Sequence, residues 1–340
     1  FKSDNLVDDE KVDTVFTKHF TAQVPLEFKN GALNYNMNWY YGPAKYQILN
    51  DYDRNLDEIM PLGWGIFGWI NRYIFIPVFG FISALGVGYG IAIVLFTILV
   101  RIVMSPVTYK SYLSQAKMKV LRPEIAELNE KFKDNPMKKQ QETMKLYSKA
   151  GVNPMAGCLP ALMQMPIFYA LFQFFPSMFD LRQKSFLWAD DLSSYDSIYQ
   201  LPFHIPFYGS HVSLFPILAS VAIFFYMKMT TGDQAMSTPP QEGMPDMGKI
   251  MKIMIYISPV MMLFFFNNYA SGLSLYYFIS NLITIGIMLV IKNYIVKEDK
   301  IHAQIQENKT KEKKESKFQR KMREMMEQAE AQKAAQQKKK

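Results

Sequence analysis

The chain has 340 residues, of which 49% are apolar and 20% charged, and its formal net charge is +8 at pH 7. A single cysteine excludes an intrachain disulfide framework and a cysteine-based zinc or iron–sulfur site. The four histidines include no pair spaced four residues apart, which argues against a histidine metal site, so no cofactor is expected. Because the sequence starts Phe-Lys-Ser, without an initiator methionine, we expect a fragment or a processed form.

Residues 1–61 are predicted to form the C-terminal edge of a β-rich domain outside the membrane. The alternating stretches AQVPLEF and ALNYNMNWYYG flank an Asn-Gly pair at residues 30–31, which is a strong β-hairpin signal. Residues 44–60 are predicted to be a helix leading towards the membrane. A piece of this size with few large apolar side chains cannot build a core alone, so the rest of the domain is expected upstream.

Residues 62–82 are predicted to form an interfacial amphipathic helix. Trp64 and Trp69 are typical of the headgroup region, while Asn71 and Arg72 place polar groups at the centre and Pro77 interrupts the segment. A sixth membrane span is the alternative interpretation.

Five apolar runs are long enough to cross the bilayer, whose hydrocarbon core of about 30 Å needs roughly 20 helical residues. Together with the N-terminal piece they predict an all-α polytopic membrane protein with a five-helix transmembrane core and a β-rich remnant of a periplasmic domain. The connection between the last two runs is short and predicts a tight helical hairpin. The five runs are residues 83–107, 155–178, 212–229, 250–268 and 272–291.

The segments between the runs differ in character. Residues 108–154 predict a helical hairpin, with helices at 109–133 and 136–150 and a break at Asp134-Asn135-Pro136. Residues 230–249 are predicted to be a loop. The basic tail, residues 292–340, has helical propensity but almost no large apolar side chain after Ile305, so a frayed or disordered extension is expected. The expected apolar face of the hairpin consists of Leu113, Ala116, Val120, Leu121, Ile125 and Leu128.

The distribution of charge predicts the orientation. Lys and Arg exceed Asp and Glu in residues 108–154 and in the tail, whereas residues 1–61 and the loop at 179–211 carry net negative charge. Since basic segments stay in the cytoplasm, the hairpin, the 230–249 loop and the C-terminus are expected inside, and the acidic segments in the periplasm.

Arg101 lies inside the first run, where a guanidinium costs roughly 2.5–3.5 kcal/mol on insertion scales. One explanation is snorkelling, because the end of the run at Val107 is only about 9 Å away along the helix. Polar side chains on the same face and on other runs favour a hydrated cavity around the charge instead. For any one of them an interhelical hydrogen bond, worth about 0.6 kcal/mol, is the simpler explanation. They are Thr97, one turn before Arg101, Gln164, and Tyr277, Asn281 and Thr284 at i, i+4 and i+7, with Ser280 beside them.

Several classes of function are disfavoured by what the sequence lacks. None of the five runs contains Asp or Glu, which a cation-coupled transporter normally needs, and no phosphate-binding loop for ATP is present. We therefore do not expect an enzyme. An anion channel or transporter that uses Arg101 is the alternative function, and a scaffold that only tethers ribosomes is a second.

Three stretches carry a resemblance to a known family. TILVRIVMSPVTYKSYLSQAKMKVLRPEIAELNEKF, NPMAGCLPALMQMPIFYALF and SGLSLYYFISNLITI, in this order, closely resemble the YidC family of membrane protein insertases, which has mitochondrial and chloroplast relatives. The likeness covers about residues 40–295. It implies a chaperone of the bacterial inner membrane that inserts and helps fold nascent membrane proteins, without ATP hydrolysis, through a hydrated groove open to cytoplasm and lipid.

The resemblance also implies a site and partners. The expected partners are nascent membrane proteins, the ribosome through the basic tail and cytoplasmic loops, the phospholipid bilayer and the Sec translocon. A solvated topology signal is an equally good explanation of the basic tail. The groove residues implied by the resemblance are Arg101, Thr97, Gln164, Met165, Phe168, Tyr277, Asn281 and Thr284.

Overall fold

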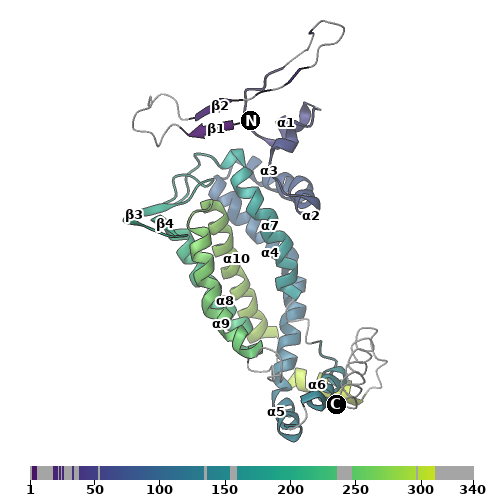
Figure 1. The fold of residues 1–340 in the computed structure, drawn as a ribbon. Helices are drawn as coiled ribbons and strands as arrows, with labels where there is room; N and C mark the ends of the chain where they lie inside the picture. Colours follow the sequence, from purple (N-terminus) through teal and green to yellow (C-terminus); the bar gives the residue numbers. More distant parts are fainter. Residues whose placement is uncertain are drawn as a thin grey trace, which may run out of the picture. The chain divides into compact units, whose positions relative to one another are not determined.

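A computed structural model of the chain describes most of its sequence and shows a mainly helical protein with two small antiparallel sheets (Figure 1). The chain divides into two compact units, Phe1–Pro43 and Ala44–Lys340. The described residues are 2–5, 18–21, 23, 25, 26, 33, 38–52, 54–133, 136–153, 159–235, 247–295 and 298–310.

The described residues of the first unit contain one strand pair. β1 (Lys2–Asn5) runs antiparallel to β2 (Lys18–Thr21), with Lys2 opposite Thr21. This pairing agrees with the β-rich character predicted for the N-terminal piece, although it involves strands that the sequence did not single out. The predicted Asn-Gly turn at residues 30–31 lies outside the described residues.

The second unit begins with short helices that lead into an apolar helical segment. α1 (Tyr46–Asp51) and a 3₁₀ turn (Leu56–Ile59) precede α2 (Gly65–Ile70), a π turn (Asn71–Phe75) and α3 (Ile76–Ala84). The last three form one helical segment, Gly65–Ala84, that is long and apolar enough to cross a membrane.

The prediction of an interfacial helix at residues 62–82 used Asn71 as part of an exposed polar centre, but Asn71 is not exposed. Its side chain is fully buried, and Nδ2 donates to Leu62 O (2.7 Å) and to Ala170 O (2.9 Å) of α7 (Leu159–Ser177). The amide therefore joins two helices instead of facing lipid headgroups. The interfacial placement itself remains a prediction.

Long helices make up the body of the second unit. α4 (Tyr89–Val120) and α10 (Ser271–Val290) pack against each other, and α8 (Leu214–Ala235) packs against α9 (Met247–Phe266) and α10 (Figure 1). α9 and α10 are joined by a short turn, as the sequence predicts.

Length and composition identify four candidate membrane spans within the described residues, and three of them correspond to predicted runs. Two other predicted runs, α7 and α8, are not among the four, and for α8 the described apolar helix is Leu214–Thr230. The span count of five therefore remains a prediction. The four are Gly65–Ala84, Tyr89–Val120, Gly248–Phe266 and Ser271–Tyr294.

α4 continues well past the predicted end of its run at residue 107. It passes through Pro106 and ends at Val120, and α5 (Arg122–Lys131) and α6 (Pro136–Ala150) follow. The predicted hairpin arm at 109–133 is thus divided, because Pro123 lies in the first turn of α5, where a proline without N–H is well accommodated.

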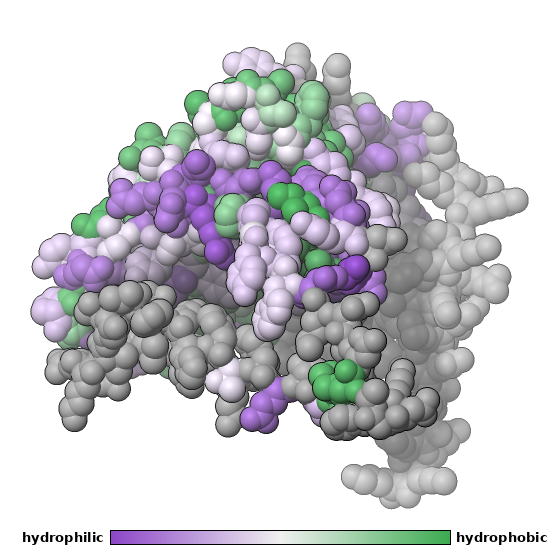
Figure 2. All heavy atoms as spheres, turned by 90° about the horizontal axis from the view of Figure 1, so that it is seen from above, coloured by the Kyte–Doolittle hydropathy of each residue, from purple (hydrophilic) through white to green (hydrophobic). Residues whose placement is uncertain are grey.

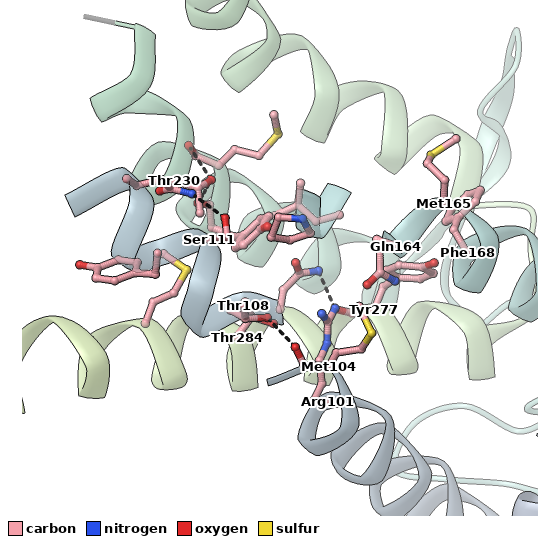
Figure 3. Close-up of a pocket in the computed structure, with 18 of the residues that line it drawn as sticks. Arg101, Met104, Thr108, Ser111, Gln164, Met165, Phe168, Thr230, Tyr277 and Thr284 are labelled. Carbon is pink, nitrogen blue, oxygen red and sulfur yellow. Dashed lines mark hydrogen bonds between the residues drawn. The ribbon is translucent and has the colours of Figure 1, made fainter. Parts of the chain in front are cut away.

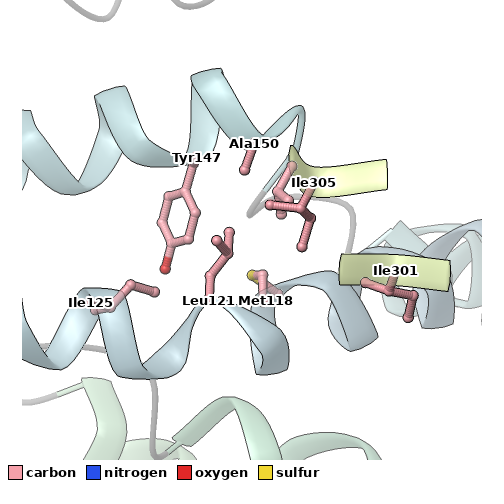
Figure 4. Close-up of a cluster of buried hydrophobic side chains, with 8 residues drawn as sticks. Met118, Leu121, Ile125, Tyr147, Ala150, Ile301 and Ile305 are labelled. Carbon is pink, nitrogen blue, oxygen red and sulfur yellow. The ribbon is translucent and has the colours of Figure 1, made fainter. Parts of the chain in front are cut away.

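The beginning of the C-terminal tail is folded, contrary to expectation. α11 (Glu298–Thr310) places Ile301 and Ile305 on one face, four residues apart, and both are buried against the ends of α4 and α6 (Figure 4). Asn308 Nδ2 also donates to Ala150 O (3.3 Å). The tail therefore has a core to pack on as far as Thr310, while residues 311–340 lie outside the described ones. We call this the α11 cluster: Met118, Leu121, Ile125, Tyr147, Ala150, Val152, Ile301 and Ile305.

The opposite end of the long helices carries a β-hairpin that the sequence did not predict. β3 (Ser197–Ile205) pairs antiparallel with β4 (Gly209–Ser213), within the segment expected to be a loop at 179–211. Just before β3, the buried Asp196 caps α8. Its Oδ2 accepts hydrogen bonds from Leu214 N (2.9 Å), Phe215 N (2.8 Å) and Trp188 Nε1 (2.9 Å).

Asn267 joins this hairpin to the turn between α9 and α10. It is fully buried, and Nδ2 donates to Tyr208 O (2.8 Å) and His211 O (2.9 Å), while Oδ1 accepts from Ser213 N (3.0 Å). Ser271 Oγ adds a bond to Asp191 O (2.9 Å). This end of the helix bundle is therefore covered by a segment with extensive main-chain hydrogen bonds, and we call it the hairpin end.

Candidate functional site

A cavity of about 440 Å³ lies between the long helices (Figure 3). Its walls come from five helices, α4, α7, α8, α9 and α10, which are far apart in sequence. The lining residues are Arg101, Met104, Thr108, Ser111, Tyr112, Gln115, Pro160, Gln164, Met165, Phe168, Ile223, Tyr226, Met227, Thr230, Met262, Tyr277, Asn281, Thr284 and Met288.

Helical periodicity explains why these residues meet. On α4 the lining positions follow Arg101 at intervals of three or four residues as far as Gln115, with Tyr112 added beside Ser111, and on α10 they keep the same spacing from Tyr277 to Met288. The eleven helical steps from Tyr277 to Met288 extend about 17 Å at 1.5 Å per residue, more than half the length of α10.

Arg101 is the only residue with a formal charge among the described residues that line the cavity. It is partly buried, and Nε donates a hydrogen bond to Oγ of the buried Ser280 on α10. Figure 3 shows the side chains of Arg101, Gln164 and Tyr277 converging on the same space. The sequence singled out Arg101 as a charge that needs an explanation and placed Ser280 beside the polar positions of α10. In the structure Ser280 is the interhelical hydrogen-bond partner of Arg101.

The polar side chains of α10 bond largely to their own helix. Asn281 Nδ2 donates to Tyr277 O (2.7 Å), and Thr284 Oγ1 donates to Ser280 O (2.8 Å). On α4, Thr108 Oγ1 donates to Met104 O (3.2 Å) in the same way. Because these donors are used within the helices, the oxygen atoms of the side chains retain the capacity to accept hydrogen bonds from a molecule in the cavity.

Two polar atoms in the cavity wall are buried without a partner among the described residues: Gln164 Nε2 and Tyr277 OH. The ring of Tyr277 packs between Phe168 (5.5 Å between ring centroids) and Phe266 (5.2 Å). An unmade hydrogen bond at a buried group costs roughly 1–3 kcal/mol. The cavity wall thus holds unused hydrogen-bonding capacity next to Arg101.

The structure brings seven of the eight predicted site residues to the cavity. Arg101, Gln164, Met165, Phe168, Tyr277, Asn281 and Thr284 all line it. Thr97 does not line it, since its side chain is fully buried and Oγ1 donates to Ile93 O (2.7 Å) of its own helix.

Other lining residues were missed by the sequence analysis. Ser111, Tyr112 and Gln115 belong to the part of α4 that was assigned to the hairpin, although they continue the spacing of the Arg101 face. Neighbouring methionines of α7 and α9 differ in their placement. Met165 and Met262 line the cavity, whereas Met163 and Met261 do not, and 45% and 64% of their surfaces are exposed.

The described residues contain no group of three or more His, Cys, Asp or Glu side chains that could hold a metal ion. The chemistry available at the cavity is therefore that of one guanidinium, several hydrogen-bonding side chains, and an apolar wall rich in methionine.

Comparisons with known proteins identify relatives. A family model described as "60Kd inner membrane protein" matches residues 80–300. The chain is 46% identical to the membrane protein insertase YidC of Parabacteroides distasonis, over 87% of this chain and 48% of the relative. It is 42% identical to the YidC of Porphyromonas gingivalis, over 94% of this chain and 52% of the relative.

The chain thus spans about half the length of the curated relatives it matches. The family match extends from α3 to α11 and includes all five helices around the cavity. The resemblance suggested by the three sequence stretches is confirmed: this chain belongs to the YidC family of 60Kd inner membrane proteins.

Proposed function

We propose that this chain is the membrane-embedded part of an insertase, which inserts nascent inner-membrane proteins and helps them fold. The observation that carries the proposal is a cavity built by five apolar helices around a single charged side chain, Arg101. The names of the relatives support it, since they are called membrane protein insertases. The chain's own residues suggest no catalytic chemistry, so we infer that insertion depends on non-covalent interactions and not on a chemical reaction.

The proposed topology has α4, α7, α8, α9 and α10 as spans and Gly65–Ala84 as an interfacial helix. The segment of α5 and α6, the 230–249 loop and the tail would lie in the cytoplasm, and the hairpin end and residues 1–61 in the periplasm. The excess of Lys and Arg in residues 108–154 and in the tail supports this orientation.

The length of the cavity explains how it would lower the barrier to insertion. A hydrophilic segment must otherwise cross about 30 Å of hydrocarbon. The cavity reaches from Met288, near the cytoplasmic end of α10 in this topology, to Tyr277, only six residues after α10 begins at Ser271. Water in such a groove would leave roughly 9 Å of helix length between its end and the periplasmic side.

The side chains around Arg101 suggest how a substrate would be held. A guanidinium in a wall of low dielectric constant attracts an acidic tail or a backbone carbonyl much more strongly than it does in water. Gln164 and Tyr277 offer further donors, which water would satisfy before a substrate arrives. Met165 and Met262 supply flexible apolar surface for an incoming helix, and the helix would then move into lipid because it is more stable there.

The hairpin end argues against the rival function of an anion channel. A channel needs a second opening, yet Asn267, Asp196 and Ser271 attach the 179–213 segment to three helices at this end. Figure 2 shows that both hydrophilic and hydrophobic side chains are exposed on the described surface in the view from above. A groove that is closed at one end fits an insertase better than a pore.

The proposed partners follow from this orientation. Nascent membrane proteins would enter the groove from the cytoplasm, and the ribosome would contact the basic tail and the cytoplasmic loops through non-specific charge. The Sec translocon is proposed as a further partner within the bilayer.

Insertion by the purified protein in liposomes tests the proposal. With substrates that have acidic translocated tails, Arg101→Glu should impair insertion more than Arg101→Lys, because only the Glu variant reverses the charge. Equal activity of the two variants would contradict the attraction step.

Crosslinking tests the groove itself, and the chain offers neighbouring controls. Photocrosslinkers at Met165 and Met262, which line the cavity, should capture a stalled nascent chain more often than those at Met163 and Met261, which do not. Equal capture at all four positions would mean that the cavity is not the path of the substrate.

A further inference from the structure

The β3–β4 hairpin exposes more aromatic surface than a water-soluble loop normally does. The exposed fractions are 62% for Tyr199, 59% for Phe203 and 90% for Phe207, and residues 197–213 contain no Asp, Glu, Lys or Arg. A long uncharged strand of this kind is an aggregation hazard in water, so natural proteins keep such strands covered. The hairpin therefore needs an environment that is not bulk water.

The tip of the hairpin is fixed to the end of a candidate membrane span. Asn268, two residues after the end of α9, donates from Nδ2 to Tyr208 O (2.9 Å) and Phe207 O (3.3 Å). The ring of Tyr208 packs edge-on against Phe264 of α9, with centroids 5.3 Å apart. The tip thus lies at the level where the apolar surface of the span ends.

The exposed surface of α9 continues towards this tip. Val260 and Met261 are 55% and 64% exposed, and Phe265, four residues after Met261, is 41% exposed. In a membrane protein these side chains face lipid, and Figure 1 shows the hairpin projecting sideways from the same ends of α8 and α9. The aromatic residues of the hairpin therefore extend a surface that is already apolar.

Pairing with another protein strand is disfavoured by the strand itself. Pro202 has no N–H to donate to a third strand, and the register with β4 is irregular between Gln200 and Ile205. In the sequence of β3, Tyr199, Leu201 and Phe203 alternate with Gln200, Pro202 and His204, although the register shift between Gln200 and Ile205 interrupts the regular pairing there. Such a ribbon can place its aromatic side chains in an apolar phase and its polar side chains in water.

We propose that the β3–β4 hairpin lies in the headgroup region of the bilayer beside α9, with Phe203 and Phe207 directed towards the acyl chains. Aromatic side chains favour this zone because their rings are apolar yet tolerate water at the edges. The absence of Lys and Arg from the hairpin indicates that it does not depend on anionic lipid. The hairpin is then an anchor that sets the depth of the hairpin end in the membrane.

Site-directed fluorescence tests this placement in the intact protein. In a Cys158→Ser background, single substitutions Phe203→Cys, His204→Cys and Phe207→Cys each carry a polarity-sensitive fluorophore after reconstitution into phosphatidylethanolamine–phosphatidylglycerol vesicles. All three side chains are exposed, so labelling leaves the packed interior intact. The labels at 203 and 207 should show blue-shifted emission and lose intensity when lipids carry a shallow spin-label quencher.

The neighbouring position provides the matched control. The label at 204, which replaces the polar His204 next to Phe203, should emit as in water and be quenched by iodide rather than by the lipid quencher. Iodide quenching at all three positions would place the hairpin in water and overturn the proposal. Protection of 203 and 207 from both quenchers would overturn it as well, because a protein surface would then cover the hairpin.

Discussion

Arg101 on α4 and Ser280 on α10 are joined by a hydrogen bond from the guanidinium Nε to the serine Oγ. The bond connects two residues that are 179 positions apart in sequence, on two different helices, and fixes the charge at the cavity wall. Among the described residues it is the one hydrogen bond made by the guanidinium, which has five N–H donors, and the cavity next to it is open to a further acceptor.

Replacing Ser280 by alanine should loosen this arrangement at a small cost in stability. Side-chain hydrogen bonds between membrane helices contribute about 0.6 kcal/mol on average, so a loss of that order is expected for Ser280→Ala in thermal unfolding. Ser274→Ala is the matched control on the same helix, because Ser274 is also buried but its Oγ has no partner among the described residues. Equal losses in the two variants would show that the bond contributes nothing.

Ile305→Ala should release α11 from its docking site. Deleting most of a buried isoleucine side chain costs roughly 2–5 kcal/mol, and Ile305 is 1% exposed in the α11 cluster. Amide hydrogens of residues 298–310 should then exchange much faster, while those of α9 remain protected. Gln304→Ala, at an exposed neighbouring position, should leave the exchange unchanged. Unaltered protection in the Ile305 variant would mean that α11 is held by other contacts.

Gly90→Ala should destabilise the start of α4, where the ring of Phe186 occupies the space that a β-carbon at residue 90 would need. Phe186 cannot easily move, because its main chain exchanges two hydrogen bonds with Ala189 (2.9 and 3.0 Å). Gly88→Ala provides the control, since a β-carbon there meets no atom within 4 Å. A lower unfolding temperature is expected for the variant at residue 90 alone, and equal unfolding temperatures would refute the close contact.

Asp196 should tolerate asparagine but not alanine. All three hydrogen bonds go to Oδ2, an acceptor that asparagine retains, whereas alanine leaves the first turn of α8 without its cap. Loss of a capping residue costs about 0.5–2 kcal/mol. Thermal unfolding should therefore rank wild type and Asp196→Asn together above Asp196→Ala. A destabilised asparagine variant would show that the cap depends on negative charge.

The same carboxyl gives a pH dependence with a definite sign. Burial raises the pKa of Asp196 above its ordinary value, against the opposing effect of the N–H donors. The folded protein then keeps a proton that the unfolded chain loses at a pH of about 4, so this group's contribution to stability falls as pH rises from there through the raised pKa. Asp196→Asn should remove that slope from a series of unfolding temperatures measured against pH.

The amino-acid sequence was sufficient for features that depend on local composition. Apolar runs identified the long helices, and Arg101 was singled out because a charge within such a run demands an explanation. The spacing of Tyr277, Asn281 and Thr284 placed them correctly on one face of α10. These inferences need only helical periodicity and the cost of a charge in an apolar setting.

Features that depend on distant partners were not predictable. The burial of Ile301 and Ile305 depends on Leu121 and Tyr147, which come from other helices. The sequence of the tail alone therefore predicted a frayed or disordered extension. Thr97 shares a helix with Arg101 but bonds to its own backbone, a choice that the sequence does not reveal. The β3–β4 hairpin was missed although apolar residues alternate along β3, because Pro202 lies in the middle of this stretch and a proline argues against a strand.

The length of α4 has a thermodynamic consequence. Arg101 at the cavity and Met118 in the α11 cluster belong to one uninterrupted helix and are separated by about 26 Å of its axis, with Pro106 between them. If a ligand of the cavity and a molecule that binds α11 each bind preferentially to one conformation of α4, the two binding equilibria are linked. Each ligand would then change the affinity of the other by the same factor, although the two do not contact each other.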